Sequence, residues 1–259
     1  MDVDPGNANT LYVAYQAPAT GSSLPDAWFS RSTDGGDTWS SPVAIGTGPN
    51  DQFRPSITSG PEGAVSMFWY DRRNDPSNTL IDVYGRFSAD RGLHWGPVER
   101  VTSTNFDPGE LNPNWDTSRR NCEWEGKIDS TFPGSGAYVI WGDGRDAGPA
   151  ANHGVNPNIY FAHVPIPTVV STAVARGTTV LTVTGAVVPK VAGGRVTTTL
   201  YRKVGTSYVK VTAKTAILDA AGKYRLTFNR PAAGSCKEIS KFLGNAEYLA
   251  STVTKTFLC

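Results

Sequence analysis

Two short stretches of the sequence share one pattern and indicate the architecture. The first is Ser32-Thr33-Asp34-Gly35-Gly36-Asp37-Thr38-Trp39, and the second is Ser88-Ala89-Asp90-Arg91-Gly92-Leu93-His94-Trp95. Both follow Ser-x-Asp-x-Gly-x-x-Trp. In a tight turn an Asp accepts backbone N–H groups, a Ser hydroxyl adds a further bond, and a Gly permits positive φ. The pattern predicts a stapled turn with Trp39 and Trp95 as apolar plugs beneath it.

A second motif also recurs. Trp69-Tyr70-Asp71-Arg72-Arg73 is echoed by Trp141-Gly142-Asp143-Gly144-Arg145, and each copy ends an apolar, β-rich run. The Asp and the last Arg of each copy lie two residues apart, on one face of a strand. We interpret each pair as an ion pair within its own repeat; a charged functional cluster is the alternative.

The repeats predict an all-β chain. Short β-rich runs alternate with Gly, Asn, Asp and Pro, and no stretch shows helical periodicity over ten or more residues. About three repeats of roughly four strands each fit into residues 1–165, which is typical of β-propeller blades. Three blades do not close a ring. Either the chain is the C-terminal part of a longer protein, which would also explain why no signal peptide is visible, or two copies complete one ring.

Composition divides the chain near Pro165. Residues 1–165 hold 11 Lys and Arg against 20 Asp and Glu, a net charge of −9, and all seven Trp. Residues 166–259 hold 13 against 3, a net charge of +10. The connector Val164-Pro165-Ile166-Pro167-Thr168 suits a short, stiff linker. We therefore expect two domains, residues 1–165 and residues 166–259.

Residues 166–259 predict six or seven short antiparallel strands, and hence an Ig-like β-sandwich. Cys236 and Cys259 bracket the last stretch, and a disulfide between them implies an oxidising compartment and export. Cys122 is left over. The positive charge of the domain fits either a solvated face or docking to an anionic polymer, such as cell-wall teichoic acid or an acidic glycan. Nucleic acid is not an expected partner, because the domain has no Trp and no nucleic-acid motif.

The two Ser-x-Asp-x-Gly-x-x-Trp stretches resemble the Asp-box, or BNR repeat, of the sialidase-like superfamily. The run from Met67 to Trp95 looks like secreted bacterial proteins described as exo-α-sialidase-like. The resemblance covers residues 1–165, and the second box has His94 where Thr is usual. It implies part of a β-propeller, about three blades, followed by the Ig-like domain, which is similar to modules appended to secreted actinobacterial proteins. The motif is specific for the fold and says little about activity.

The resemblance also sets what catalysis would require. Sialidases of this superfamily hold the substrate carboxylate with three arginines and use a Tyr–Glu nucleophile and an Asp acid/base. Arg54, in Phe53-Arg54-Pro55, is similar to the first arginine of the family, although this sequence lacks the Ile of the family's Arg-Ile-Pro motif. Because Phe53-Arg54-Pro55 also aligns with Leu111-Asn112-Pro113, the alternative is that Arg-Pro is simply the usual start of a blade. Glu123, beside Trp124, is a second catalytic candidate, with a surface acid as the alternative.

The expected function is that of a secreted sialidase-type glycoside hydrolase acting on extracellular glycans. The alternatives are a non-catalytic propeller that binds glycans or cell-surface partners, and a purely structural module. No metal site is expected, since His94, His153 and His163 are scattered along the sequence. The alternative is a Ca²⁺ ion bound by oxygen ligands of the acidic loops 71–82 and 143–158. No apolar run is long enough for a membrane-spanning helix.

Overall fold

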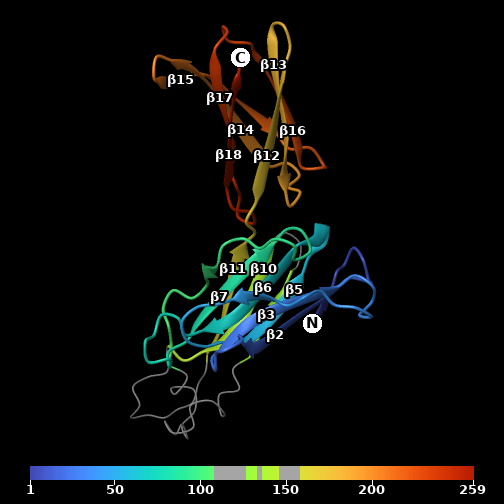
Figure 1. Ribbon diagram of the computed structural model, residues 1–259, viewed down its shortest axis with the longest axis vertical. Coiled ribbons are helices and arrows are strands. Elements are labelled where there is room, and N and C mark those ends of the chain that lie inside the picture. Colours follow the sequence, from blue (N-terminus) through green and yellow to red (C-terminus); the bar gives the residue numbers. More distant parts are fainter. Residues whose placement is uncertain (108–126, 133–135, 146–157) are drawn as a thin grey trace, which may run out of the picture. The chain divides into compact units, whose positions relative to one another are not determined.

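The computed structural model describes residues 1–107, 127–132, 136–145 and 158–259 (Figure 1). This part of the chain is all-β, as predicted, and its strands form five small sheets, none of them closed into a barrel. It divides into two compact units, Met1–Val164 and Pro165–Cys259. In the described ranges, no helix has the length and apolarity needed to cross a membrane.

The first unit contains three sheets whose strands follow one another in chain order. The first sheet consists of β1 (Asp2–Val3), β2 (Leu11–Pro18), β3 (Pro25–Ser32) and β4 (Val43–Gly46). The second consists of β5 (Gln52–Ser59), β6 (Val65–Asp71), β7 (Asp82–Ser88) and β8 (Glu99–Arg100). The third consists of β9 (Ile128–Thr131), β10 (Gly136–Asp143) and β11 (Asn158–Pro165).

Strand β6 lies at the centre of this unit, and all seven of its residues are buried. Its side chains alternate between two cores, because successive residues of a strand point to opposite faces. Met67 and Trp69 pack with residues of the first sheet, among them Phe29 and Ile45. Phe68 and Tyr70 pack with residues of the third sheet, including Val139 and Trp141. The second sheet is therefore covered on both faces, which explains its continuous apolar run.

Gly46 of β4 allows the first sheet to approach the second closely, and Gly85 of β7 leaves room for the ring of Phe68, its partner on β6 in the same sheet. A Cβ on Gly46 would lie 2.5 Å from Trp69, and a Cβ on Gly85 would lie 2.5 Å from Phe68. Both aromatic rings are almost fully buried, so neither has space to move aside.

The third sheet leaves its other face exposed in the part of the chain that the structure describes. Val139 and Trp141 of β10 are buried, whereas the alternate residues Tyr138 and Ile140 are exposed. On β11, the large apolar side chains of Ile159 and Phe161 are 80% and 70% exposed. This face thus has the apolar character of the faces that the second sheet buries.

The second unit is built from two further sheets. The fourth sheet has the order β12 (Val169–Arg176), β13 (Val180–Val188), β16 (Lys223–Asn229). The fifth has the order β15 (Ser207–Ile217), β14 (Arg195–Val204), β17 (Ser235–Phe242), β18 (Ser251–Leu258). One apolar core lies between them, with Leu181 and Phe228 from the fourth sheet and Leu200 and Phe242 from the fifth.

The last two strands of this unit are held together covalently. The structure contains the predicted disulfide between Cys236 and Cys259, whose Cα atoms are 5.6 Å apart. The Arg230 guanidinium donates a hydrogen bond to the Cys259 carbonyl oxygen at 2.9 Å. The bridge spans 23 residues of sequence, and a loop of this size stabilises the folded state by about 3 kcal/mol.

We predict that Gly46→Ala destabilises the first unit by about 1–3 kcal/mol, because the new methyl group overlaps the buried Trp69 ring. Gly142→Ala is the matched control, since a Cβ at Gly142 meets no atom of the described residues within 4 Å. Urea unfolding followed by tryptophan fluorescence measures both changes. Equal stability of the two variants would show that the sheets do not pack as closely as described.

Candidate functional site

Both Ser-x-Asp-x-Gly boxes form the turn after the third strand of a four-stranded sheet. Ser32 is the last residue of β3 and Ser88 the last residue of β7. In the first box, the Gly36 N–H donates to the Ser32 hydroxyl at 2.9 Å, and the Thr38 N–H donates to the Asp34 carboxylate at 2.9 Å. Gly36 has a φ of 103°, which explains the glycine.

The second box repeats these contacts with one exchange. The Gly92 N–H donates to the Ser88 hydroxyl at 2.9 Å, and the His94 N–H donates to the Asp90 carboxylate at 2.8 Å. The imidazole Nδ1 of His94 lies 2.6 Å from the other oxygen of Asp90. In the first box, the Thr38 hydroxyl occupies this place on Asp34. His94 therefore substitutes chemically for the usual Thr.

These bonds hold both carboxylates in the ionised form. Hydrogen bonds from the Ser32 hydroxyl and from Thr38 lower the pKa of Asp34 to about 2. At Asp90, partial burial raises the pKa, but hydrogen bonds from the His94 N–H, the His94 imidazole and the Ser88 hydroxyl outweigh it, so the net pKa is lowered. Each Asp of a box is thus engaged within its own turn, which is a structural role.

The prediction that both box tryptophans are apolar plugs is wrong for Trp39. The Trp95 ring of the second box meets Phe29 of the preceding sheet edge to face, with ring centres 5.1 Å apart. Trp39 is 41% exposed, and its indole N–H donates to the Gly36 carbonyl at 3.1 Å. Trp95 thus packs on the sheet before its own, whereas Trp39 meets no such sheet in the ranges that the structure describes.

The Trp-x-Asp-x-Arg repeats form ion pairs within their own sheets. Asp71 accepts hydrogen bonds from the Trp69 indole at 2.8 Å and from the Arg73 Nε at 2.8 Å. Asp143 accepts from the Trp141 indole and the Arg145 Nε, both at 2.9 Å. In addition, each guanidinium stacks over a tyrosine, namely Tyr84 for Arg73 and Tyr160 for Arg145, at 4.4 and 4.5 Å from the ring centre. The residues are fully engaged in structure, and the alternative of a charged functional cluster has no support here.

Arg54 departs from this regular pattern. It lies in β5 at an irregularity between Phe53 and Ser56, where pairing with β6 is interrupted, and it has a φ of 49°. Pro55 lacks an N–H group to donate, so it fits an unpaired position. The Gln16 side-chain oxygen accepts the Arg54 N–H at 2.7 Å and holds the distortion. A positive φ at a non-glycine residue costs free energy and is concentrated at functional positions.

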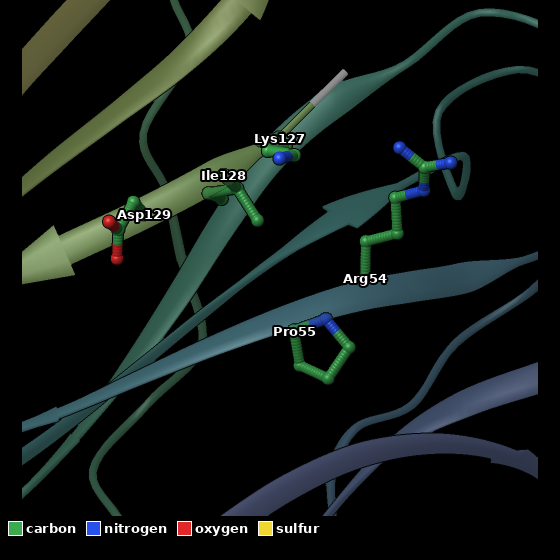
Figure 2. Close-up of a pocket in the computed structure, with 5 residues that line it drawn as sticks. All are labelled: Arg54, Pro55, Lys127, Ile128 and Asp129. Atoms are coloured by element: carbon green, nitrogen blue, oxygen red, sulfur yellow. The ribbon is translucent and has the colours of Figure 1, made fainter. Parts of the chain in front are cut away.

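A small depression opens beside Arg54. It has a volume of about 290 Å³ and is lined by Arg54 and Pro55 of β5, Lys127, and Ile128 and Asp129 of β9 (Figure 2). The two strands are neighbours, because the hydroxyls of Ser56 and Ser130 lie 2.9 Å apart. The depression thus combines two cationic side chains, both exposed, with one carboxylate.

Tyr70 supports the rim of this depression through a hydrogen bond to Lys127. Its side chain is fully buried, and its hydroxyl donates to the Lys127 carbonyl oxygen at 3.0 Å. Burial raises the pKa of Tyr70, although the Gly142 N–H and the positive charge of Arg54 act in the opposite direction. A buried, neutral phenol that already donates its proton is a support for the rim and not a nucleophile.

The other candidate site residues from the sequence do not form a functional site in the described residues. Glu123 and Cys122 lie outside the described residues, as does most of the acidic loop 143–158. In the loop 71–82, the Asp75 carboxylate accepts the N–H groups of Thr79 and Leu80, both at 2.8 Å, so it staples its own loop. Within the ranges that the structure describes, no three His, Cys, Asp or Glu side chains gather closely enough to hold a metal ion. Lys127 and Asp129 were missed by sequence reasoning, because no motif surrounds them.

We predict that Asp90→Asn destabilises the first unit by about 1 kcal/mol at pH 7, because the charged acceptor of the His94 contacts is lost. The folded-state pKa of Asp90 lies below the ordinary value of an aspartate, 3.8. Its contribution is therefore present above about pH 4 and is lost as the pH falls through the folded-state pKa. Unfolding between pH 5 and 2 should depend less on pH in the variant than in the wild type. Asp37→Asn is the control; an identical pH dependence of Asp90→Asn and wild type would contradict the assigned role.

Comparison with known proteins adds no assignment. No protein-family model matches the chain, and no curated protein matches it significantly. The candidate site therefore rests on the geometry around Arg54 and on the resemblance carried by the two boxes.

Proposed function

We propose that this chain is an extracellular glycan-binding protein of the sialidase-like type, in which the first unit holds the anionic group of an acidic sugar. The observation that carries the proposal is the meeting of Arg54 and Lys127 at one depression on neighbouring strands. A guanidinium grips a carboxylate with two parallel hydrogen bonds, and an ammonium adds a second positive charge. The Asp129 carboxylate can accept hydrogen bonds from sugar hydroxyls.

The arrangement of the sheets supports an interpretation of the first unit as consecutive propeller blades. The first two sheets are four-stranded meanders with a box at the same turn, and their first strands β1 and β5 contact each other, as do β5 and β9. First strands line the centre of a propeller, where ligands bind. In such a ring, the exposed apolar face of the third sheet packs against a further blade.

The second unit fits an Ig-like sandwich that attaches the protein to an anionic polymer outside the cell. The orders β12-β13-β16 and β15-β14-β17-β18 correspond to the three-plus-four strand arrangements of such sandwiches. The disulfide favours an oxidising compartment and thus export. With 13 Lys and Arg against 3 Asp and Glu, the unit attracts polyanions.

We predict that Arg54→Ala weakens binding of free sialic acid by about 10- to 100-fold, because a charge-assisted, bidentate contact is lost. Arg54→Lys should recover only part of the affinity, since an ammonium lacks the guanidinium fork. Calorimetric titration measures both variants. Arg31→Ala is the matched control, because the Arg31 guanidinium donates to the Arg91 carbonyl oxygen in the second box and does not line the depression.

Two outcomes would refute this site. Arg54→Ala could bind sialic acid as tightly as the wild type, or a neutral sugar such as N-acetylglucosamine could bind equally well. Circular dichroism of each variant shows whether the fold is retained.

Hydrolysis is the second candidate function, and Asp129 is the observation that favours it. Asp129 lines the same depression as Arg54, and the resemblance implies that an Asp serves as the acid/base. Among the residues that line the depression there is no Tyr–Glu pair. Catalysis therefore needs a nucleophile from elsewhere, and binding remains the leading proposal.

If the chain is a hydrolase, Asp129→Asn should lower its release of a fluorogenic leaving group from an α-sialoside by at least about 100-fold, the usual contribution of an acid/base. Asp37→Asn removes an exposed carboxylate in the first box and should retain full activity. No release by the wild-type protein would reject the hydrolase candidate for this chain, without touching the binding proposal.

A further inference from the structure

The fifth sheet has one face that points away from the core of the second unit. Along β14, Val196, Thr198 and Leu200 are buried, and along β17 the buried residues are Cys236, Glu238, Ser240 and Phe242. Because side chains alternate along a strand, the residues between them lie on the opposite face. We call this opposite face the basic sheet face.

The basic sheet face carries five cationic side chains, placed there by alternation and strand register: Arg195, Lys203, Lys210, Lys237 and Lys241. Residues 165–259 are all described, and they contain three acidic residues, none of which lies on this face. Asp219 follows β15 in a turn, Glu247 precedes β18, and Glu238 is buried on the core side. The charges of the face are therefore not neutralised by carboxylates of their own sheet.

Lys237 is held at the middle of this face by two aromatic rings. Its ammonium lies 5.0 Å from the ring centre of Tyr201 and 4.7 Å from that of Tyr208. The Tyr208 hydroxyl in turn lies 2.9 Å from the Ser235 hydroxyl, which fixes the ring. A cation held in this way loses little conformational entropy when it binds an anion.

Hydroxyl groups fill the space between the cations. Opposite Lys237 and Lys241 on β18 lie Thr256 and Thr252, with Thr254 between them, and all three are exposed. On the same face, between β14 and β15, the Thr197 and Thr215 hydroxyls lie 2.9 Å apart. Such groups donate and accept hydrogen bonds, as sugar hydroxyls do.

We propose that the basic sheet face is the surface of the second unit that binds a linear acidic polysaccharide. The inference rests on the proposed extracellular role and identifies the face that performs it. Lys210 and Lys237 flank β14 at roughly 10 Å, and Lys237 and Lys241 are about 13 Å apart along β17, given standard strand spacings. These intervals are comparable with one disaccharide repeat, so successive anionic groups of one extended chain can meet successive cations.

The composition of the face favours a glycan over a nucleic acid. Proteins that bind single-stranded nucleic acid offer open aromatic rings on which bases stack. Here both tyrosines of the face are half-buried and already contact the Lys237 ammonium. The exposed Thr hydroxyls and the Lys ammonium groups can instead bind the hydroxyls and the anionic groups of a polysaccharide.

The test compares two double variants of the whole 259-residue protein. Lys210→Gln/Lys241→Gln removes two charges from the basic sheet face, and Lys223→Gln/Arg225→Gln removes two exposed charges from β16 of the other sheet. Fluorescence anisotropy with a labelled polygalacturonate oligomer reports the affinity at several salt concentrations. We expect the face variant to bind about 10- to 30-fold more weakly, and the control to change by no more than about twofold.

Three results would overturn the inference: equal losses in the two double variants, equal affinity for neutral dextran, or equal affinity for a single-stranded DNA with the same number of charges. Competition with free sialic acid, the ligand proposed for the first unit, separates the two surfaces. An excess of sialic acid should leave labelled polygalacturonate bound to the wild type, and full displacement would place polymer binding in the first unit. Conversely, failure of the sialic acid test leaves the basic sheet face standing.

Discussion

The burial of β6 on both faces is the constraint on which the first unit depends. A strand that buries Met67 and Trp69 on one side and Phe68 and Tyr70 on the other requires a sheet against each face. The neighbouring sheets must come close enough to exclude water, and glycine at position 46, beside the Trp69 ring, makes this possible for the first two sheets. The hydrophobic effect thus fixes the order of three sheets along the chain, and the polar motifs act on a framework already set.

The polar motifs close the ends of this framework. The Asp-containing boxes satisfy backbone N–H groups at the turns, and the Trp-x-Asp-x-Arg units satisfy the indole N–H groups of otherwise buried tryptophans. Arg91, inside the second box, also donates to the buried Asp4 carboxylate at 2.9 Å, which ties the second sheet to the first. Leaving such groups unpaired would cost more free energy than the pairs themselves contribute, which explains why the box recurs in the first two sheets and the Trp-x-Asp-x-Arg unit in the second and third.

Much of this was predictable from the sequence because repetition exposes structural residues. The all-β class, the two stapled turns, the ion pairs of Asp71 and Asp143 and the Cys236–Cys259 bridge follow from spacing and residue type alone. The failures concern relations between elements. Trp39 and Trp95 share one motif, yet in the described residues Trp95 packs on Phe29 of the preceding sheet whereas Trp39 is exposed. Lys127 and Asp129 could not be found, because only the approach of β9 to β5 places them beside Arg54.

This contrast also indicates where binding residues belong. A residue that recurs between repeats has a side chain that packs or forms hydrogen bonds within its own sheet, so it has a structural role. Arg54 breaks the regular strand with its positive φ, whereas Asn112, its expected counterpart in the sequence, lies outside the described residues. Lys127 and Asp129 have no counterpart motif. A side chain at a position outside the repeated motifs can differ between repeats and can therefore suit a ligand. The strained backbone at Arg54 is tolerated because the Gln16 side chain and the two buried cores hold the surrounding strands in place.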